Sequence, residues 1–117
     1  MPRRAFIDVS HGQIHYRHAG AATGAAARPL VMFHTNPTSS RDLVPLMGRL
    51  AARRRVIAPD TPGLGDSDRL PQAQPEIADY AAAMIEAIDA LGLGAVDLYG
   101  SHTGANLAVE IAILRPP

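Results

Sequence analysis

The sequence predicts an α/β fold, a single domain in which parallel strands lie between helices. Strand and helix patterns alternate from residue 30 onward, a predicted antiparallel hairpin precedes them, and one strand runs through a glycine-flanked turn directly into a helix. Such alternation is typical of a parallel sheet with helices on both faces. No internal repeat or domain boundary interrupts it, so residues 1–117 are expected to form one domain.

The first elements are two strands, at 5–10 and 13–18, because apolar and polar residues alternate on both sides of His11-Gly12. A loop of small residues follows at 20–28. Residues 30–34 form a continuous apolar run, which is typical of a strand buried on both faces. A hairpin followed by a central strand is therefore expected at the start of the sheet.

Helices and strands then take turns along the rest of the chain. Helical spacing of apolar residues predicts helices at 42–52, 76–91 and 105–114, and short apolar runs predict strands at 55–58 and 96–99. Residues 61–75 are rich in Gly, Pro and Asp, which predicts a loop.

Gly100-Ser101-His102-Thr103-Gly104 is the most informative pattern in the chain. It follows a predicted strand and opens a predicted helix, which is the setting of a nucleophile elbow. The two glycines permit a sharp turn and a close approach of strand and helix. Their register raises His102, and not Ser101, above the sheet. His102 is therefore the candidate catalytic residue, at a position where a serine or aspartate is expected.

Composition excludes several classes of function. Of the 117 residues, 47% are hydrophobic, and eleven arginines balance eleven acidic residues with no lysine. The absence of net charge argues against a nucleic-acid partner, and the absence of lysine excludes Schiff-base chemistry by lysine. The run 53–55 is the single basic cluster, and we expect it to be a solvated corner.

The chain has no cysteine, which excludes a disulfide framework, a thiolate nucleophile and a cysteine-based metal site. No stretch approaches about eighteen apolar residues, so no membrane partner is expected. A cytoplasmic location is the default expectation, and no cofactor is predicted. The expected partner is a small-molecule substrate or ligand.

Three blocks, in this order and spacing, resemble the N-terminal half of an α/β-hydrolase: residues 34–40 (HTNPTSS), residues 55–68 (RVIAPDTPGLGDSD) and the elbow. The Asn-Pro-Thr-Ser-Ser variant most resembles the haloalkane dehalogenase and epoxide hydrolase branch. The resemblance implies an incomplete α/β-hydrolase fold, with residues 1–117 forming a partial domain that runs through the elbow and its following helix.

In that family the first block supplies part of the oxyanion hole. The resemblance implies an oxyanion and substrate site at Thr35, Asn36 and Thr103, with structural roles nearby for His34, Pro37, Gly100 and Gly104 and a cis bond before Pro37. Thr35 replaces a glycine, so its loop must differ in backbone or carry strain. Thr103 replaces the dehalogenase tryptophan that helps to hold halide, which leaves Asn36 without that partner.

The other histidines, His11, His15 and His18, are expected at the surface or edge of the hairpin, and no metal site is predicted. The sequence ends at residue 117, and by resemblance the triad acid and base would lie beyond that point. We therefore expect a fragment, a truncated product or half of an assembly. An incomplete sheet would expose an apolar edge, which predicts self-association.

Three classes of function stay open. The first is a hydrolase acting, in a complete form, on a small uncharged ester, epoxide or halide, with this chain inactive by itself. The second is a lyase or cofactor-independent oxygenase of the same fold, which would keep a histidine base. The third is a non-catalytic remnant or ligand-binding module.

Overall fold

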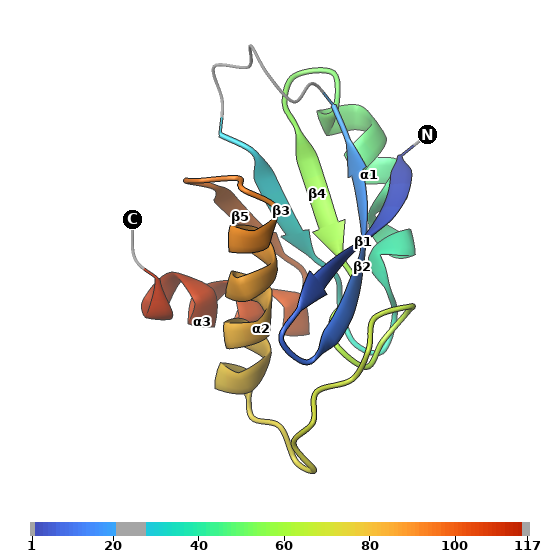
Figure 1. The fold of residues 1–117 in the computed structure, drawn as a ribbon. Helices are drawn as coiled ribbons and strands as arrows, with labels where there is room; N and C mark the ends of the chain where they lie inside the picture. The colour runs from blue at the N-terminus through green and yellow to red at the C-terminus, as the bar shows by residue number, and fades with distance from the viewer. Residues whose placement is uncertain (1, 21–27, 116–117) are drawn as a thin grey trace.

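The computed structural model describes residues 2–20 and 28–115, so most of the loop predicted at 20–28 lies outside the described residues. Five strands form one mixed sheet with the spatial order β1-β2-β4-β3-β5 (Figure 1). The elements in chain order are β1 (Arg3–Val9), β2 (Gly12–Ala19), β3 (Leu30–Phe33), the 3₁₀ helix η1 (Ser40–Leu43), α1 (Val44–Leu50), β4 (Val56–Pro59), α2 (Ile77–Ala90), β5 (Asp97–Gly100) and α3 (Thr103–Leu114). The predicted α/β class is confirmed.

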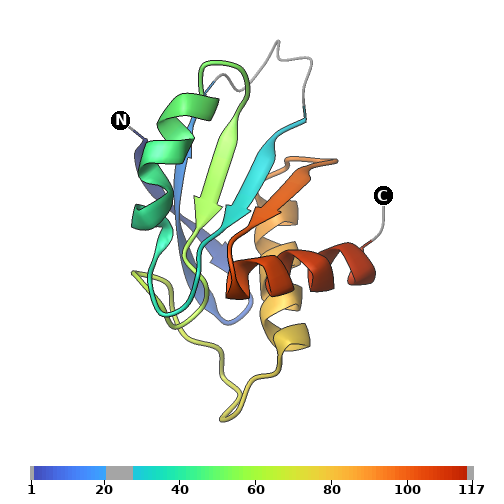
Figure 2. The ribbon, with the colours of Figure 1, turned by 180° about the vertical axis from the view of Figure 1, so that it is seen from behind.

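The hairpin joins the parallel strands through β2. β1 and β2 pair antiparallel from Arg3–His18 to Val9–Gly12, as the alternation predicts. β2 also pairs antiparallel with β4, whereas β3 lies parallel between β4 and β5. The carboxyl ends of β3, β4 and β5 therefore point to the same edge of the sheet (Figure 2). The loops that follow these strands meet at that edge.

Helices cover both faces of the sheet, as predicted. Val31 and Phe33 face α2 and α3, where they pack in one buried cluster with residues such as Met84 and Leu107. Met32 points to the opposite face, because side chains alternate along a strand, and packs in a second cluster with residues of α1 and β4. The expectation that this strand is buried on both faces is confirmed.

The helix predicted over 42–52 is shorter and starts differently. It begins as η1, with the Ser39 hydroxyl accepting a bond from Arg41 N at 3.2 Å, and continues as α1. Pro45 lies in the first turn of α1, where a missing N–H leaves no intrahelical bond unmade. The helix predicted over 76–91 is confirmed as α2, and a capping box between Glu76 and Asp79 fixes its start.

The expectation of a solvated corner at 53–55 is wrong for Arg54. Only 20% of its side chain is exposed, and it donates to the carbonyl of Arg28 and, at 2.7 Å, to the carboxylate of Asp97. Arg54 therefore ties the segments that enter β3 and β5 to the one that enters β4. Within the described residues, no helix combines the length and the apolar character needed to cross a membrane.

Candidate functional site

The turn between β5 and α3 has the geometry of the predicted elbow. His102 is the one non-glycine residue with positive φ in the described part of the chain, at φ 53° and ψ −116°. Ser101 follows β5 directly and is tied to the end of β3, because its N–H donates to the carbonyl of Phe33 at 3.2 Å. The register is as predicted, with His102 at the apex and Ser101 one place before it. Backbone of this kind costs about 1–3 kcal/mol and concentrates at functional sites.

Gly100 and Gly104 allow the backbone of the elbow to approach neighbouring backbone closely. A Cβ atom on Gly104 would lie 2.2 Å from the carbonyl oxygen of Phe33, and one on Gly100 would lie 2.2 Å from the carbonyl oxygen of Gly104. No side chain fits at such distances. α3 therefore crosses the end of β3 in direct backbone contact.

His34 holds together the loops that follow β3 and β4. It is 1% exposed; its Nδ1 donates to the carbonyl of Thr35 at 2.8 Å, and its Nε2 accepts from Thr61 N at 3.0 Å. Both ring nitrogens are thus hydrogen-bonded to the backbone, which leaves the imidazole no free position for proton transfer. The Asn36–Pro37 bond is cis, as the resemblance implies.

The loop at Thr35, where the family has glycine, differs in backbone and does not carry strain. The φ of Thr35 is not positive, so the loop adopts a backbone that a β-branched residue tolerates and carries no strain at this position. The Thr35 carbonyl accepts from Thr38 N at 3.1 Å and from the Thr38 hydroxyl at 2.6 Å, which closes a tight turn.

A cavity of about 190 Å³ lies beside the elbow. Its lining comes from the loops after β3 and β4 and from the first turns of α2 and α3: His34, Asn36, Thr61, Ile77, Tyr80, Thr103, Gly104, Asn106 and Leu107. None of these is a carboxylate, a lysine or an arginine. Five lining residues were not predicted as site residues: Thr61, Ile77, Tyr80, Asn106 and Leu107. Local patterns assign each of them to its own loop or helix and give no sign that this element borders a cavity.

The structure brings the predicted residues Asn36 and Thr103 together. The backbone N–H of Asn36 donates to Thr103 Oγ1 at 2.6 Å, across 67 residues of sequence. Thr103, which by resemblance stands where a dehalogenase has tryptophan, thus contacts the main chain of Asn36 through its hydroxyl. That Asn36 lacks the tryptophan partner for holding halide stays a prediction.

His102 and Thr35 are not among the residues that line this cavity. The side chain of His102 is exposed, and none of the described residues is hydrogen-bonded to its imidazole. A general base is ordinarily oriented by a second group, commonly an acid. The catalytic role of His102 stays a prediction, and the described residues give its ring no such partner.

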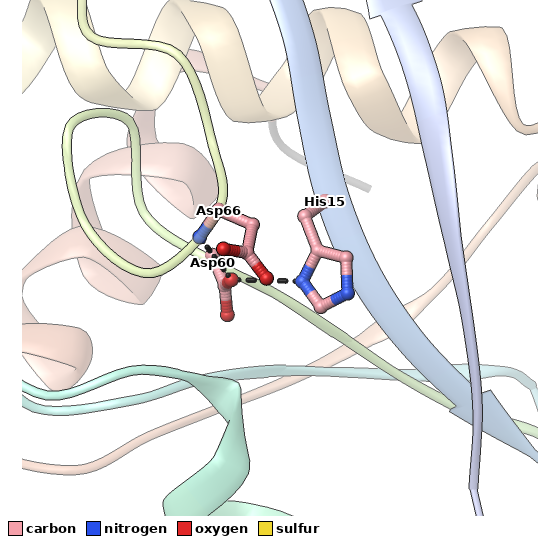
Figure 3. A group of neighbouring side chains, drawn as sticks. All are labelled: His15, Asp60 and Asp66. Atoms are coloured by element: carbon pink, nitrogen blue, oxygen red, sulfur yellow. Dashed lines mark hydrogen bonds and ion pairs between the residues drawn. The ribbon is translucent and has the colours of Figure 1, made fainter.

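A second polar cluster lies where β2 meets the loop after β4 (Figure 3). His15 is 2% exposed, and its Nδ1 lies 2.8 Å from Oδ2 of Asp60. The expectation that His15 is a surface or edge residue is wrong. Alternation along a strand assigns His15 to one face of the sheet, but it does not predict that a buried carboxylate lies on that face.

Asp60 is the centre of this cluster. Its Oδ1 accepts from Ser40 N at 2.9 Å, and its Oδ2 accepts from Asp66 N at 3.0 Å in addition to His15. Burial by itself raises the pKa of Asp60, but the hydrogen bonds from Ser40, Asp66 and His15 outweigh it, so this pKa lies below the ordinary aspartate range. A single carboxylate thereby joins β2, η1 and the loop after β4.

His15, Asp60 and Asp66 are also the residues closest to a metal-binding arrangement, with one donor atom of each within 4.8 Å of the others. Asp60 and His15 already engage each other, and both Asp60 oxygens accept backbone N–H groups. The geometry is therefore that of a hydrogen-bonded structural junction. Local sequence patterns did not predict this junction, because His15 and Asp60 are 45 residues apart.

Comparison with known proteins agrees with this architecture. A family profile described as alpha/beta hydrolase fold matches residues 28–117. The chain is 33% identical over 110 residues to haloalkane dehalogenase 2 of Mycobacterium bovis, covering 94% of this chain and 37% of that protein. It is 36% identical over 94 residues to a 2-hydroxymuconate semialdehyde hydrolase of a Pseudomonas species, covering 78% of this chain and 33% of that protein.

Solved structures show the same relationship. A haloalkane dehalogenase variant from Bradyrhizobium elkanii superposes with a TM-score of 0.88 at 28% identity, covering 99% of this chain and 37% of that one. An epoxide hydrolase from an endophytic Streptomyces superposes with a TM-score of 0.86 at 25% identity, covering 98% and 34%. The chain thus spans roughly a third of the length of the relatives it matches. It belongs to the α/β-hydrolase family, has the N-terminal part of that fold, and is related to the haloalkane dehalogenase and epoxide hydrolase branch.

Proposed function

We propose that the chain supplies the ligand cavity of a hydrolase-family protein that acts, in a complete form, on a small uncharged molecule such as an ester, epoxide or halide. The cavity beside the elbow carries this proposal. Ile77, Tyr80 and Leu107 offer it an apolar wall, whereas Asn36 and Thr103 contribute amide and hydroxyl groups. Such a lining suits a small ligand with an apolar body and one polar end.

The relatives support hydrolytic chemistry for a complete protein. Their names include a haloalkane dehalogenase, a semialdehyde hydrolase and an epoxide hydrolase. They differ from one another in the bond they attack, so the fold by itself does not select the reaction. The cavity lining holds no carboxylate, lysine or arginine, which favours an uncharged substrate.

The 117-residue chain is expected to show no esterase, epoxide hydrolase or dehalogenase turnover above that of His102→Ala. The elbow apex carries an exposed imidazole in place of a serine or aspartate, and Ser101 is held one place too early by its bond to Phe33. The assay compares wild type, His102→Ala and Ser101→Ala on activated esters, small epoxides and small haloalkanes.

His102→Ser serves as the matched control of that experiment. It restores a nucleophile at the apex, yet it is also expected to be inactive, because no described histidine is placed to activate it. Wild-type turnover that vanishes in His102→Ala would contradict the proposal, since the histidine would then perform chemistry unaided.

A ligand-binding module is the second candidate. The unoriented His102 and the already partnered Asn36 N–H favour binding without turnover. A lyase or cofactor-independent oxygenase would instead need His102 to accept a proton from the bound substrate. Binding of a small neutral molecule, measured by chemical-shift changes at Asn36 and Tyr80, would support a ligand site in this chain. The absence of product from a complete form of the protein that binds the same molecule would then select the module over both enzyme classes.

We also propose that the chain associates with itself through the side of the sheet that ends at β5. In the described chain β5 pairs only with β3, and the neighbouring α3 exposes Val109, Ile113 and Leu114 by 59%, 66% and 49%. Sedimentation is expected to show concentration-dependent association that Ile113→Glu weakens. A monomer that persists at high concentration and unfolds in one sharp transition would contradict this.

A further inference from the structure

The hydrogen bond between Asn36 and Thr103 lies in the lining of the cavity. Asn36 N–H donates to Thr103 Oγ1 at 2.6 Å, and both residues line the cavity and are solvent-exposed. An N–H group that faces a ligand cavity ordinarily offers its proton to the ligand. Here the proton is already committed to a side chain of the protein.

We infer that the Thr103 hydroxyl fills, from within the chain, a position that an anionic ligand oxygen would otherwise take, and so makes the cavity select uncharged ligands over carboxylates. The inference rests on the proposed function, because it names the residue that sets the ligand class of the same cavity.

Two features of the site support this assignment. The N–H of Thr103 has no acceptor among the described residues, and the N–H of Asn36 donates to the hydroxyl of the same threonine, so the two N–H groups belong to neighbouring residues of the cavity lining. With the hydroxyl removed, both N–H groups could donate to one anionic oxygen. Hydrogen bonds to a charged acceptor are roughly twice as strong as those to a neutral one.

The hydroxyl does not close the cavity to neutral ligands. A hydroxyl that accepts one bond can still donate its own proton, so Thr103 can bind a carbonyl or amide oxygen. A carboxylate gains less from this arrangement, because one hydroxyl replaces two N–H groups and the carboxylate must give up its water. Selection between the two ligand types therefore depends on one side-chain oxygen.

The test uses butyrate and its neutral counterpart butyramide, whose short apolar tail suits a cavity of about 190 Å³. Binding to the full 117-residue chain is followed by NMR titration of the Asn36 amide. Thr103→Ala is expected to bind butyrate about five- to tenfold more tightly than wild type, and butyramide within about twofold. Thr103→Ser, which keeps the hydroxyl, is expected to bind butyrate as wild type does.

Thr103→Val distinguishes two effects of Thr103→Ala, namely the space that opens when Oγ1 is removed and the loss of Oγ1 as a hydrogen-bond acceptor. Its methyl group fills the place of Oγ1 without accepting a bond, so it is expected to show no gain for butyrate. The inference is wrong if Thr103→Ala and Thr103→Ser bind butyrate equally, or if Thr103→Ala gains equally for both ligands, since a larger cavity would then explain the change. Butyramide binding to wild type reports separately on the proposed function, and its failure would leave the butyrate comparison to decide the inference.

Discussion

Asp60→Asn is expected to lower the free energy of unfolding by about 3 kcal/mol. The asparagine side chain has an NH₂ group where the carboxylate has an oxygen, so this group would face a hydrogen-bond donor and not an acceptor. Ser40 N, Asp66 N and His15 Nδ1 all point at this carboxylate, at 2.8–3.0 Å. At least one buried donor would lose its acceptor. Urea unfolding, followed by far-ultraviolet circular dichroism, measures the change.

Asp42→Asn is the matched control, since Asp42 is exposed and its carboxylate makes no hydrogen bond with the described residues. A change within about 0.5 kcal/mol is expected there. If both variants unfolded at the same urea concentration, Asp60 would not be the junction described above.

Acid should abolish the difference between wild type and Asp60→Asn. The pKa of Asp60 is lowered in the folded chain, so the carboxylate contributes stability that is fully present above the pKa of the unfolded chain. That contribution is lost as the pH falls through the lower folded pKa. The two unfolding curves are therefore expected to converge below the ordinary aspartate range, and a constant difference across that range would contradict the assignment.

The sequence predicted those features that depend on neighbours along the chain. The elbow follows from two glycines four residues apart, and the faces of β3 follow from its uninterrupted apolar run. The resemblance of three blocks predicted the cis bond before Pro37 and the α/β-hydrolase fold. The cis bond is present, and a family profile that matches residues 28–117 confirms the fold.

The features that escaped prediction join residues far apart in sequence. His15 meets Asp60 across 45 residues, Arg54 meets Asp97 across 43, and Asn36 meets Thr103 across 67. Periodicity assigns a residue to a face of its own element, but it does not say which polar group of another element lies opposite. The ligand class of the cavity depends on such a pair, so it required the structure.

Gly104→Ala and Gly48→Ala make the same chemical change and are expected to change stability in opposite directions. At Gly104 a Cβ would lie 2.2 Å from the carbonyl oxygen of Phe33 and 2.7 Å from that of His34. Both contacts are with the backbone of a buried strand end, which cannot rotate away as a side chain would. Gly104→Ala is therefore expected to cost more than about 3 kcal/mol.

Gly48 lies inside α1, where a Cβ would meet nothing within 4 Å, and its φ is not positive. Alanine there restricts the unfolded chain and favours the helix, so Gly48→Ala is expected to gain about 0.5–1 kcal/mol. Thermal unfolding of the two variants beside wild type measures both changes. The start of α3 reaches the edge of the cavity because Gly104 contacts the backbone of β3. If the two variants were equally stable, this close contact would be absent, and the elbow would not bring Thr103 and Asn36 together in this way.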